Sequence, residues 1–202
     1  MNELKEIFGE ERIVGLAGDK NSGKTNNLVR LIVDYREQRK DVLIYAYGMP
    51  KEVMKFLKKY NVKEISSLKQ MIKKRNCILI LDEMQKLRLN DRRYKDQLAE
   101  FVDFIYHRNV YVILSSPNIR EFNTVIGSVI ERWLLKSIRI DSCINGSQLK
   151  TTIDEYKGKY KSLGCVDVPV DEILVINNDE EKIIKCKYIK EADTKKRIKN
   201  LF

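Results

Sequence analysis

Eight consecutive residues near the N-terminus have the types and order needed to hold a nucleotide phosphate tail: Gly18, Asp19, Lys20, Asn21, Ser22, Gly23, Lys24 and Thr25. The glycines let the backbone curl, so that successive N–H groups point inward and bind anionic oxygens. Lys24 brings a positive charge to the β- and γ-phosphates, and the Thr25 hydroxyl is a Mg²⁺ ligand. This order predicts a phosphate-binding P-loop for ATP and Mg²⁺, and its alternative is a glycine-rich turn without a ligand.

Two acidic residues end an apolar run about sixty residues further along the chain. The run is Cys-Ile-Leu-Ile-Leu at residues 77–81, and Asp82 and Glu83 follow it directly. An acid at the carboxyl end of a buried strand beside the P-loop can hold the Mg²⁺ water shell, which is the role expected of Asp82. Glu83 is then placed to accept a proton from the attacking water. Asp-Glu is also ordinary in loops, but together with the P-loop it predicts hydrolysis.

Four short apolar runs predict the strands that position these residues. They cover residues 13–17, 42–46, 77–81 and 110–114. Each is apolar on both faces, which is typical of parallel strands covered by helices on both sides. Helical patterns lie between them, at residues 25–38, 50–60, 62–75 and 91–108, the last of which Asp91 can cap. The alternation predicts a three-layer α/β fold with a mostly parallel sheet and right-handed crossovers.

The C-terminal part is expected to add a β-hairpin. Residues 172–176 and 182–190 flank an Asn-Asn-Asp turn, and the second segment alternates apolar and lysine residues, which predicts one buried and one basic face. A fifth strand is expected at residues 132–140. We expect residues 1–202 to form a single domain, with a core at about 10–141 and the hairpin and a basic tail at about 165–202.

Composition and charge limit the possible classes of protein. Hydrophobic residues make up 43% of the chain and charged residues 34%, as in soluble globular proteins. The chain has neither a run of about 20 apolar residues nor a secretory signal, which predicts a cytoplasmic protein without stable membrane insertion. Four cysteines without a C-x-x-C pair and one histidine argue against zinc and disulfides. The net charge of +10 favours a polyanion partner or, alternatively, indicates a lysine-rich solvated surface.

The order of the motifs resembles that of the FtsK/HerA-type DNA-pumping ATPases and the viral genome-packaging ATPases related to them. The P-loop strand is followed by the Asp82-Glu83 strand, then by an amphipathic helix ending at Arg108 and by the strand that leads to Ser116. The resemblance covers roughly residues 10–140. It implies a RecA/ASCE-like P-loop fold and a homo-oligomeric ring of five or six subunits that threads double-stranded DNA. A viral packaging role would add a capsid portal or vertex protein as partner, in the host cytoplasm or on the virion.

The resemblance also implies further site residues. Arg108 best matches the arginine finger that reaches the γ-phosphate of a neighbouring subunit, with Arg120 and Arg132 as other candidates; its alternative is an exposed arginine at a helix end. Related motors often end the fourth strand with a Gln or Asn that senses the γ-phosphate. Here Ser116 holds that place and Asn118 follows, so both are sensor candidates.

Basic clusters are the candidates for DNA contact. The first cluster follows the Asp82-Glu83 edge and consists of Arg88, Arg92, Arg93 and Lys95. Two other clusters, at residues 73–75 and 195–197, are alternatives, and each cluster can equally be a solvated helix end. Poor aromatic interleaving argues against stacking of single-stranded bases.

Three other readings of the same residues stay open. Asp82-Glu83-Met84-Gln85 also fits zinc-containing thymidine kinases, with Glu83 as base for a nucleoside hydroxyl, but the chain lacks their C-x-x-C pairs. A helicase loader of the AAA+ type would carry a helical lid where a hairpin is expected. A non-enzymatic P-loop regulator would not need intact Lys24, Thr25, Asp82 and Glu83.

Overall fold

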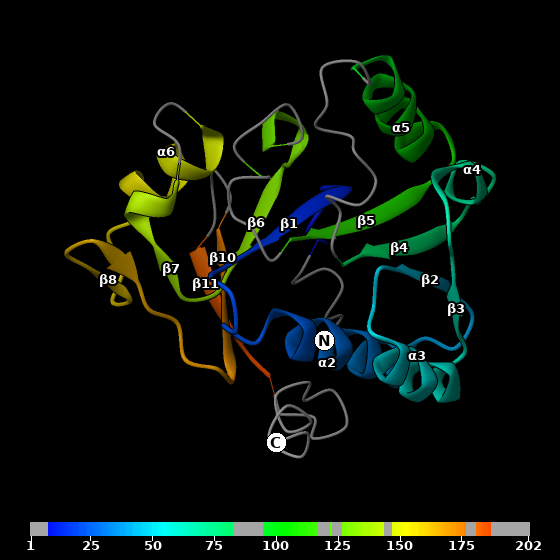
Figure 1. Ribbon diagram of the computed structural model, residues 1–202, viewed down its shortest axis with the longest axis horizontal. Helices are drawn as coiled ribbons and strands as arrows, with labels where there is room; N and C mark the ends of the chain where they lie inside the picture. The colour runs from blue at the N-terminus through cyan, green and yellow to red at the C-terminus, as the bar shows by residue number, and fades with distance from the viewer. Residues whose placement is uncertain are drawn as a thin grey trace, which may run out of the picture.

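The computed structural model describes residues 8–82, 95–116, 122, 127–143, 147–176 and 181–186. An eight-stranded sheet runs through these residues in the order β11-β10-β6-β1-β5-β4-β2-β3 (Figure 1). Its strands are β1 (Ile13–Ala17), β2 (Leu43–Tyr47), β3 (Val62–Glu64), β4 (Cys77–Leu81), β5 (Val110–Ser115), β6 (Arg132–Leu135), β10 (Glu172–Ile176) and β11 (Glu181–Lys185). β10 pairs antiparallel with β6 and with β11, and the other pairs are parallel.

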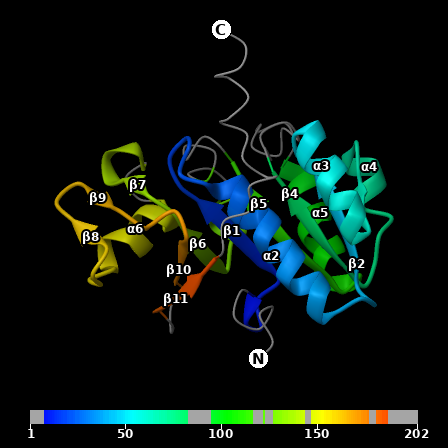
Figure 2. The same cartoon turned by 90° about the horizontal axis from the view of Figure 1, so that it is seen from below.

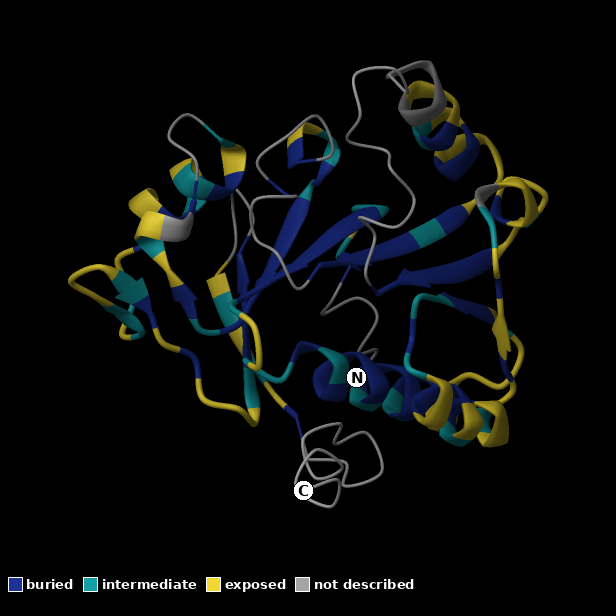
Figure 3. Ribbon diagram, viewed as in Figure 1, coloured by how far each residue is buried: buried dark blue, intermediate teal, exposed yellow. Residues whose placement is uncertain are grey.

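Helices cover both faces of this sheet. α2 (Lys24–Gln38) and α3 (Lys51–Leu57) lie on one face, and α5 (Lys95–His107) and α6 (Gln148–Glu155) lie on the other (Figures 1 and 2). The inner strands β1, β4, β5, β6 and β10 are buried almost throughout, whereas the outer strands β3 and β11 are largely exposed or half-buried (Figure 3). β1 divides its side chains between two hydrophobic clusters, with Val14 and Leu16 in one and Ile13 and Ala17 in the other. The predicted three-layer α/β fold is therefore confirmed.

Close packing on β1 requires a glycine at its centre. A Cβ added to Gly15 would lie 2.7 Å from the indole ring of Trp133 on the neighbouring strand β6. Trp133 is 2% exposed, and its ring meets Phe122 edge-on with ring centroids 5.3 Å apart. The indole therefore lies directly against the backbone of the strand that leads into the predicted P-loop.

The apolar runs and the hairpin were predicted close to their true bounds. The runs at 13–17 and 77–81 are β1 and β4, and those at 42–46 and 110–114 are β2 and β5, with small shifts at their ends. The predicted helix at 25–38 is α2, and α5 occupies the described part of the predicted helix at 91–108. The hairpin strand at 172–176 is β10, and its partner β11 ends at Lys185. Asp91, residues 187–190 and the basic tail lie outside the described residues.

Two predicted elements were wrong. Residues 62–75 form the short edge strand β3 and a single helical turn, α4 (Leu68–Met71), instead of one helix. Val62 and Ile65 are buried three positions apart, which imitates a helical pattern, but Asn61 takes a φ of 56° and Val62 pairs in parallel with Ile44. The strand expected at 132–140 ends at Leu135, and β7 (Ile138–Arg139) joins a different sheet.

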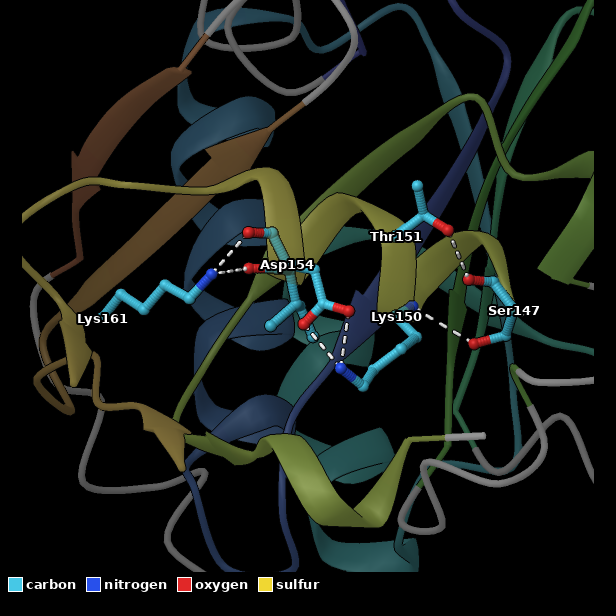
Figure 4. A network of polar contacts seen from close by, with 6 residues as sticks. Ser147, Lys150, Thr151, Asp154 and Lys161 are labelled. Carbon is cyan, nitrogen blue, oxygen red and sulfur yellow. Dashed lines mark hydrogen bonds and ion pairs between the residues drawn. The ribbon is translucent and has the colours of Figure 1, made fainter. Parts of the chain in front are cut away.

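That second sheet lies beside α6 and was not predicted. It has the order β7-β9-β8, where β8 is Lys161–Ser162 and β9 is Cys165–Val166. Ser147 caps α6 by accepting a bond from the Lys150 N–H (3.2 Å), and the Lys161 ammonium donates to the carbonyls of Ile153 and Asp154 at 2.8 and 2.6 Å (Figure 4). Strands of two residues leave no apolar run, so the sequence carries no signal for this sheet.

Cysteine state and helix length add two observations on the described residues. All four cysteines are free thiols, and Cys143 is buried beside α6. None of the helices in the described ranges has the length and apolar character needed to cross a bilayer.

Candidate nucleotide-binding site

The predicted P-loop lies between the carboxyl end of β1 and the first turn of α2. Two residues give the loop its curvature, because Asn21 has a φ of 68° and Gly23, which precedes α2, has a φ of 91°. A Cβ on Gly18 would come within 2.7 Å of both Lys136 Cβ and Ser22 Oγ, so this position admits only glycine. The loop therefore has the curled backbone that an anion nest at a helix N-terminus requires.

Lys24 lies against the backbone of its own loop. Its side chain is 7% exposed, and its Nζ donates to the carbonyl oxygens of Gly18 and Asp19, both at 2.8 Å. Burial lowers the pKa of Lys24 to about 8, against the opposing influence of the carboxylates of Asp82 and Asp19. The ammonium group is thus held at the loop by weak partners that a phosphate oxygen can replace.

Thr25 and Asp82 meet at the carboxyl end of the parallel strands. Thr25 Oγ1 donates to Asp82 Oδ2 at 3.0 Å, and Asp82, directly after β4, is 5% exposed. The Asp82 backbone N–H is fixed by a 2.9 Å bond to the Tyr47 carbonyl at the end of β2. A hydroxyl and a carboxylate at this spacing are the hard oxygen donors that Mg²⁺ takes from proteins, usually one or two of them beside phosphates and waters. The residues present therefore fit a Mg²⁺ ion.

β5 lies between the P-loop strand and the Asp82 strand. β1 pairs with β5, and β5 pairs with β4. Ser116 follows β5 and is fully buried, so this sensor candidate lies between the two motifs. Sequence reasoning passed over the preceding Ser115, whose buried hydroxyl has no hydrogen-bond partner within the described part of the chain. Glu83, Asn118 and Arg120 lie outside the described residues.

Arg108 lies at the amino end of the parallel strands, whereas the P-loop lies at their carboxyl end. It is exposed between α5 and the amino end of β5, where its carbonyl accepts a 2.9 Å bond from the Asn76 N–H. β5 has six residues at about 3.3 Å each, so the two ends of the strands are about 20 Å apart. Arg108 therefore lies far from the P-loop of its own chain. The other described candidate, Arg132, is 3% exposed and ion-paired with Glu11 at 3.1 Å.

The candidate DNA contacts are described only in part. Arg88, Arg92 and Arg93 lie outside the described residues, as does the cluster at 195–197, and Lys95 is described only as the first residue of α5. The alternative cluster at 73–75 is described: its ends are exposed, and the Lys74 ammonium lies 4.7 Å from the centroid of the Tyr45 ring.

Sequence reasoning missed Lys136 and Ser137, which follow β6. Lys136 is fully buried, and its Nζ donates to the carbonyls of Pro169 at 2.6 Å, Val170 at 3.2 Å and Glu172. Burial lowers its pKa to about 8. The only sequence signal is a lysine that directly follows the apolar run Trp133-Leu134-Leu135.

Lys136 and Ser137 connect the residues that lead into β10 with the P-loop. Ser137 Oγ donates to Asp167 Oδ1 at 2.7 Å or to the Val168 carbonyl at 3.0 Å, and the Ser137 carbonyl accepts from the Asp19 N–H at 2.8 Å. A Cβ on Gly23 would meet the Val170 side chain at 3.5 Å. Residues 167–172, which we call the clamped segment, therefore lie against the P-loop.

Comparisons with protein-family models and with curated proteins find no match to this sequence. Solved structures do match. One is the DNA-packaging ATPase from Sulfolobus Turreted Icosahedral Virus, with a TM-score of 0.61, 12% identity and coverage of 88% of this chain and 98% of that one. Another is the conjugation coupling protein TcpA of pCW3, with a TM-score of 0.53, 11% identity and coverage of 94% and 64%.

A third is the cytoplasmic domain of the Type VII Secretion ATPase EccC of Thermomonospora curvata, with a TM-score of 0.55, 12% identity and coverage of 91% of this chain but 24% of that one. The chain thus spans all but a little of the viral ATPase and about a quarter of the secretion ATPase. At these identities the likeness shows the fold. With the strand order and the loop geometry above, it establishes that this chain has the α/β fold of the P-loop NTPases.

Proposed function

We propose that the chain hydrolyses ATP with Mg²⁺ as a P-loop ATPase of the FtsK/HerA type, and that it uses the energy to translocate double-stranded DNA into a viral capsid. The observation that carries the proposal is the convergence of three motif residues. Lys24 lies on the curled loop, and Thr25 and Asp82 bring two oxygen ligands within 3.0 Å of each other.

The reaction follows from the chemistry of these groups. The loop N–H groups and the Lys24 ammonium bind the phosphate oxygens, and Thr25 and Asp82 would hold a Mg²⁺ ion, which would offset negative charge on the phosphate tail. Glu83 follows Asp82 directly and accepts a proton from the attacking water. Arg108 of a neighbouring subunit supplies a guanidinium to the developing charge, in a homo-oligomeric ring. Ser116, with Asn118 near it, hydrogen-bonds the water or the γ-phosphate.

Two observations support DNA as the cargo: the positive net charge of the chain and the names of structurally similar proteins. Two of the similar structures are a DNA-packaging ATPase and a conjugation coupling protein by their names. The secretion ATPase offers a rival cargo, since a related structure holds a signal sequence peptide. A net charge of +10 favours a polyanion over a peptide cargo.

The other readings of the motifs find less support. A helicase loader of the AAA+ type would carry a helical lid after the core, whereas the described residues after 143 form one eight-residue helix, α6, and four strands, which include the hairpin of β10 and β11. A thymidine kinase of the compact type would carry paired C-x-x-C zinc motifs, and the sequence has none. The kinase reading is tested below with thymidine.

The test is ATP turnover by the purified chain, with Lys24→Ala as the inactive control. Phosphate release is measured without additions, with long duplex DNA and with a signal peptide, and formation of thymidine monophosphate is measured with thymidine. We expect turnover that duplex DNA stimulates and that Lys24→Ala lacks. Stimulation by the peptide alone would indicate a secretion role, phosphate transfer to thymidine would indicate a kinase, and absence of ATP binding would refute the whole proposal.

A further inference from the structure

Basic side chains are concentrated at one end of the sheet. Residues 51–75, which we call the basic edge, contain two acids, Glu52 and Glu64, and nine basic residues: Lys51, Lys55, Lys58, Lys59, Lys63, Lys69, Lys73, Lys74 and Arg75. Nine positive and two negative charges give +7, whereas the whole chain carries +10. About an eighth of the chain thus holds most of its net charge.

The fold gathers these residues around one strand. β3 is the last strand of the sheet, and α3, the 3₁₀ helix η1 (Lys58–Tyr60) and α4 surround it (Figure 1). Of the nine basic side chains, eight are exposed, and Lys74 is partly covered by Tyr45. In Figure 3 most of the same region, at the right of the view, is coloured as exposed. Two acids can neutralise at most two of the nine charges within the basic edge.

The chemistry of the basic edge selects one class of polyanion. Its two aromatic residues, Phe56 and Tyr60, are half-buried and pack on each other with ring centroids 5.2 Å apart, so they form no platform for unstacked bases. Ile72 is its one exposed large apolar side chain among the described residues, which is too little to anchor it in a bilayer. Eight of its nine basic residues are lysines, which contact phosphates as point charges without reading bases.

We propose that the basic edge binds the phosphate backbone of duplex DNA. This inference rests on the proposed function and places its DNA contact at β3, away from the P-loop strand. The candidate cluster at 73–75 becomes one end of a wider surface. Backbone contact without base recognition suits a protein that moves along any sequence.

The basic edge is joined to the candidate metal site by main-chain bonds. The Ile65 N–H donates to the Ala46 carbonyl at 2.9 Å, and the next carbonyl on β2, that of Tyr47, accepts from the Asp82 N–H at 2.9 Å. A displacement of β2 would therefore act on Asp82 directly. DNA bound at β3 lies two strands from the acid that is expected to hold the metal, which is a short path for coupling.

The experiment compares two triple variants with the same change in charge. The edge variant combines Lys58→Gln, Lys59→Gln and Lys63→Gln, and the control combines Lys157→Gln, Lys159→Gln and Lys185→Gln at the other end of the molecule. All six lysines are exposed. Binding of a 30-base-pair duplex is measured by fluorescence anisotropy at several salt concentrations, and circular dichroism confirms that each variant is folded.

We expect the edge variant to bind duplex about tenfold more weakly at 0.1 M salt, with a salt slope about 0.9 smaller for each phosphate that it no longer neutralises. The control should stay within about twofold of the wild type, and the triple Lys→Arg version of the edge variant should bind as the wild type does, because it keeps the charge. Equal weakening in the edge and control variants, or unchanged binding in the edge variant, would overturn the assignment.

Two further arms separate this inference from the proposed function. Stronger binding of the wild type to polyglutamate or to phosphatidylserine vesicles than to duplex would assign the basic edge to another partner and refute the inference. If DNA stimulates ATP turnover in the wild type but the edge variant binds DNA normally, only the location of the DNA contact at the basic edge is refuted. A wild type that does not bind duplex at low salt would refute both.

Discussion

Thr25 Oγ1 lies 3.0 Å from Asp82 Oδ2, although the two residues are 57 positions apart and follow two strands, β1 and β4, that do not pair with each other. β5 separates the two strands, so the contact depends on the helix N-terminus that follows β1 reaching across the end of β5. This pair of oxygens is the geometric basis for the metal in the proposed reaction.

Asp82→Asn should raise the Mg²⁺ concentration required for ATP turnover by about tenfold or more, because the amide brings no negative charge to the ion or its water shell. The measurement is phosphate release titrated with Mg²⁺ at saturating ATP. Thr25→Ser keeps a hydroxyl and should leave the Mg²⁺ requirement near that of the wild type. An unchanged Mg²⁺ midpoint in Asp82→Asn would show that Asp82 does not serve the metal.

ATP affinity should fall with rising pH because of Lys24. Its pKa in the free protein is about 8, and a bound triphosphate stabilises the ammonium and so raises that pKa. Between the two values binding takes up a proton, and affinity falls by up to about tenfold per pH unit above pH 8. Calorimetry in buffers of different ionisation enthalpy measures the uptake. Lys24→Arg keeps its charge and should lack this dependence; a pH-independent wild type would contradict the assignment.

Glu83→Gln should bind ATP but hydrolyse it about 10²- to 10⁴-fold more slowly, because the amide cannot accept the proton of the attacking water. Single-turnover phosphate release, together with binding of a fluorescent ATP analogue, separates the two steps. Glu64→Gln on the exposed strand β3 removes the same charge and should not change hydrolysis without DNA. Turnover of Glu83→Gln equal to that of the wild type would exclude Glu83 as the base.

Arg108 should act only in a neighbouring subunit, because it lies at the amino end of the strands and its own P-loop lies at their carboxyl end. Lys24→Ala and Arg108→Ala should each be inactive alone, and a mixture should regain part of the activity. Arg75→Ala changes another exposed arginine and should keep turnover without DNA. Absence of recovery at every mixing ratio would count against Arg108 as the finger.

Lys136→Met should destabilise the chain by about 1–3 kcal/mol and weaken ATP binding, because the carbonyls of Pro169, Val170 and Glu172 lose their shared donor. Urea unfolding measures the first effect, and ATP titration measures the second. Lys161→Met also removes a lysine bound to two carbonyls, but at α6, and should reduce stability without changing ATP affinity. Equal ATP affinities in Lys136→Met and the wild type would show that the clamped segment only stabilises the fold.

The sequence predicted the inner strands and the position of the curled loop between β1 and α2 well, because both depend on local signals. Buried parallel strands are apolar on both faces, and the loop depends on eight adjacent residues. The edge strand β3 was mistaken for a helix because its three residues have one buried side chain, Val62, and Ile65 follows at helical spacing. Lys136 could not be recognised because its partners are 33 to 36 residues away and are main-chain atoms, which no residue type reveals.

The packing of Trp133 on Gly15 has a practical consequence. Trp133 is the only tryptophan in the chain, and it is buried against the strand that carries the phosphate loop. Excitation at the red edge of protein absorbance therefore reports on a single indole packed on the strand that leads into that loop. Any movement of the strand on nucleotide binding should change its emission, so the chain carries its own spectroscopic probe and needs no added label.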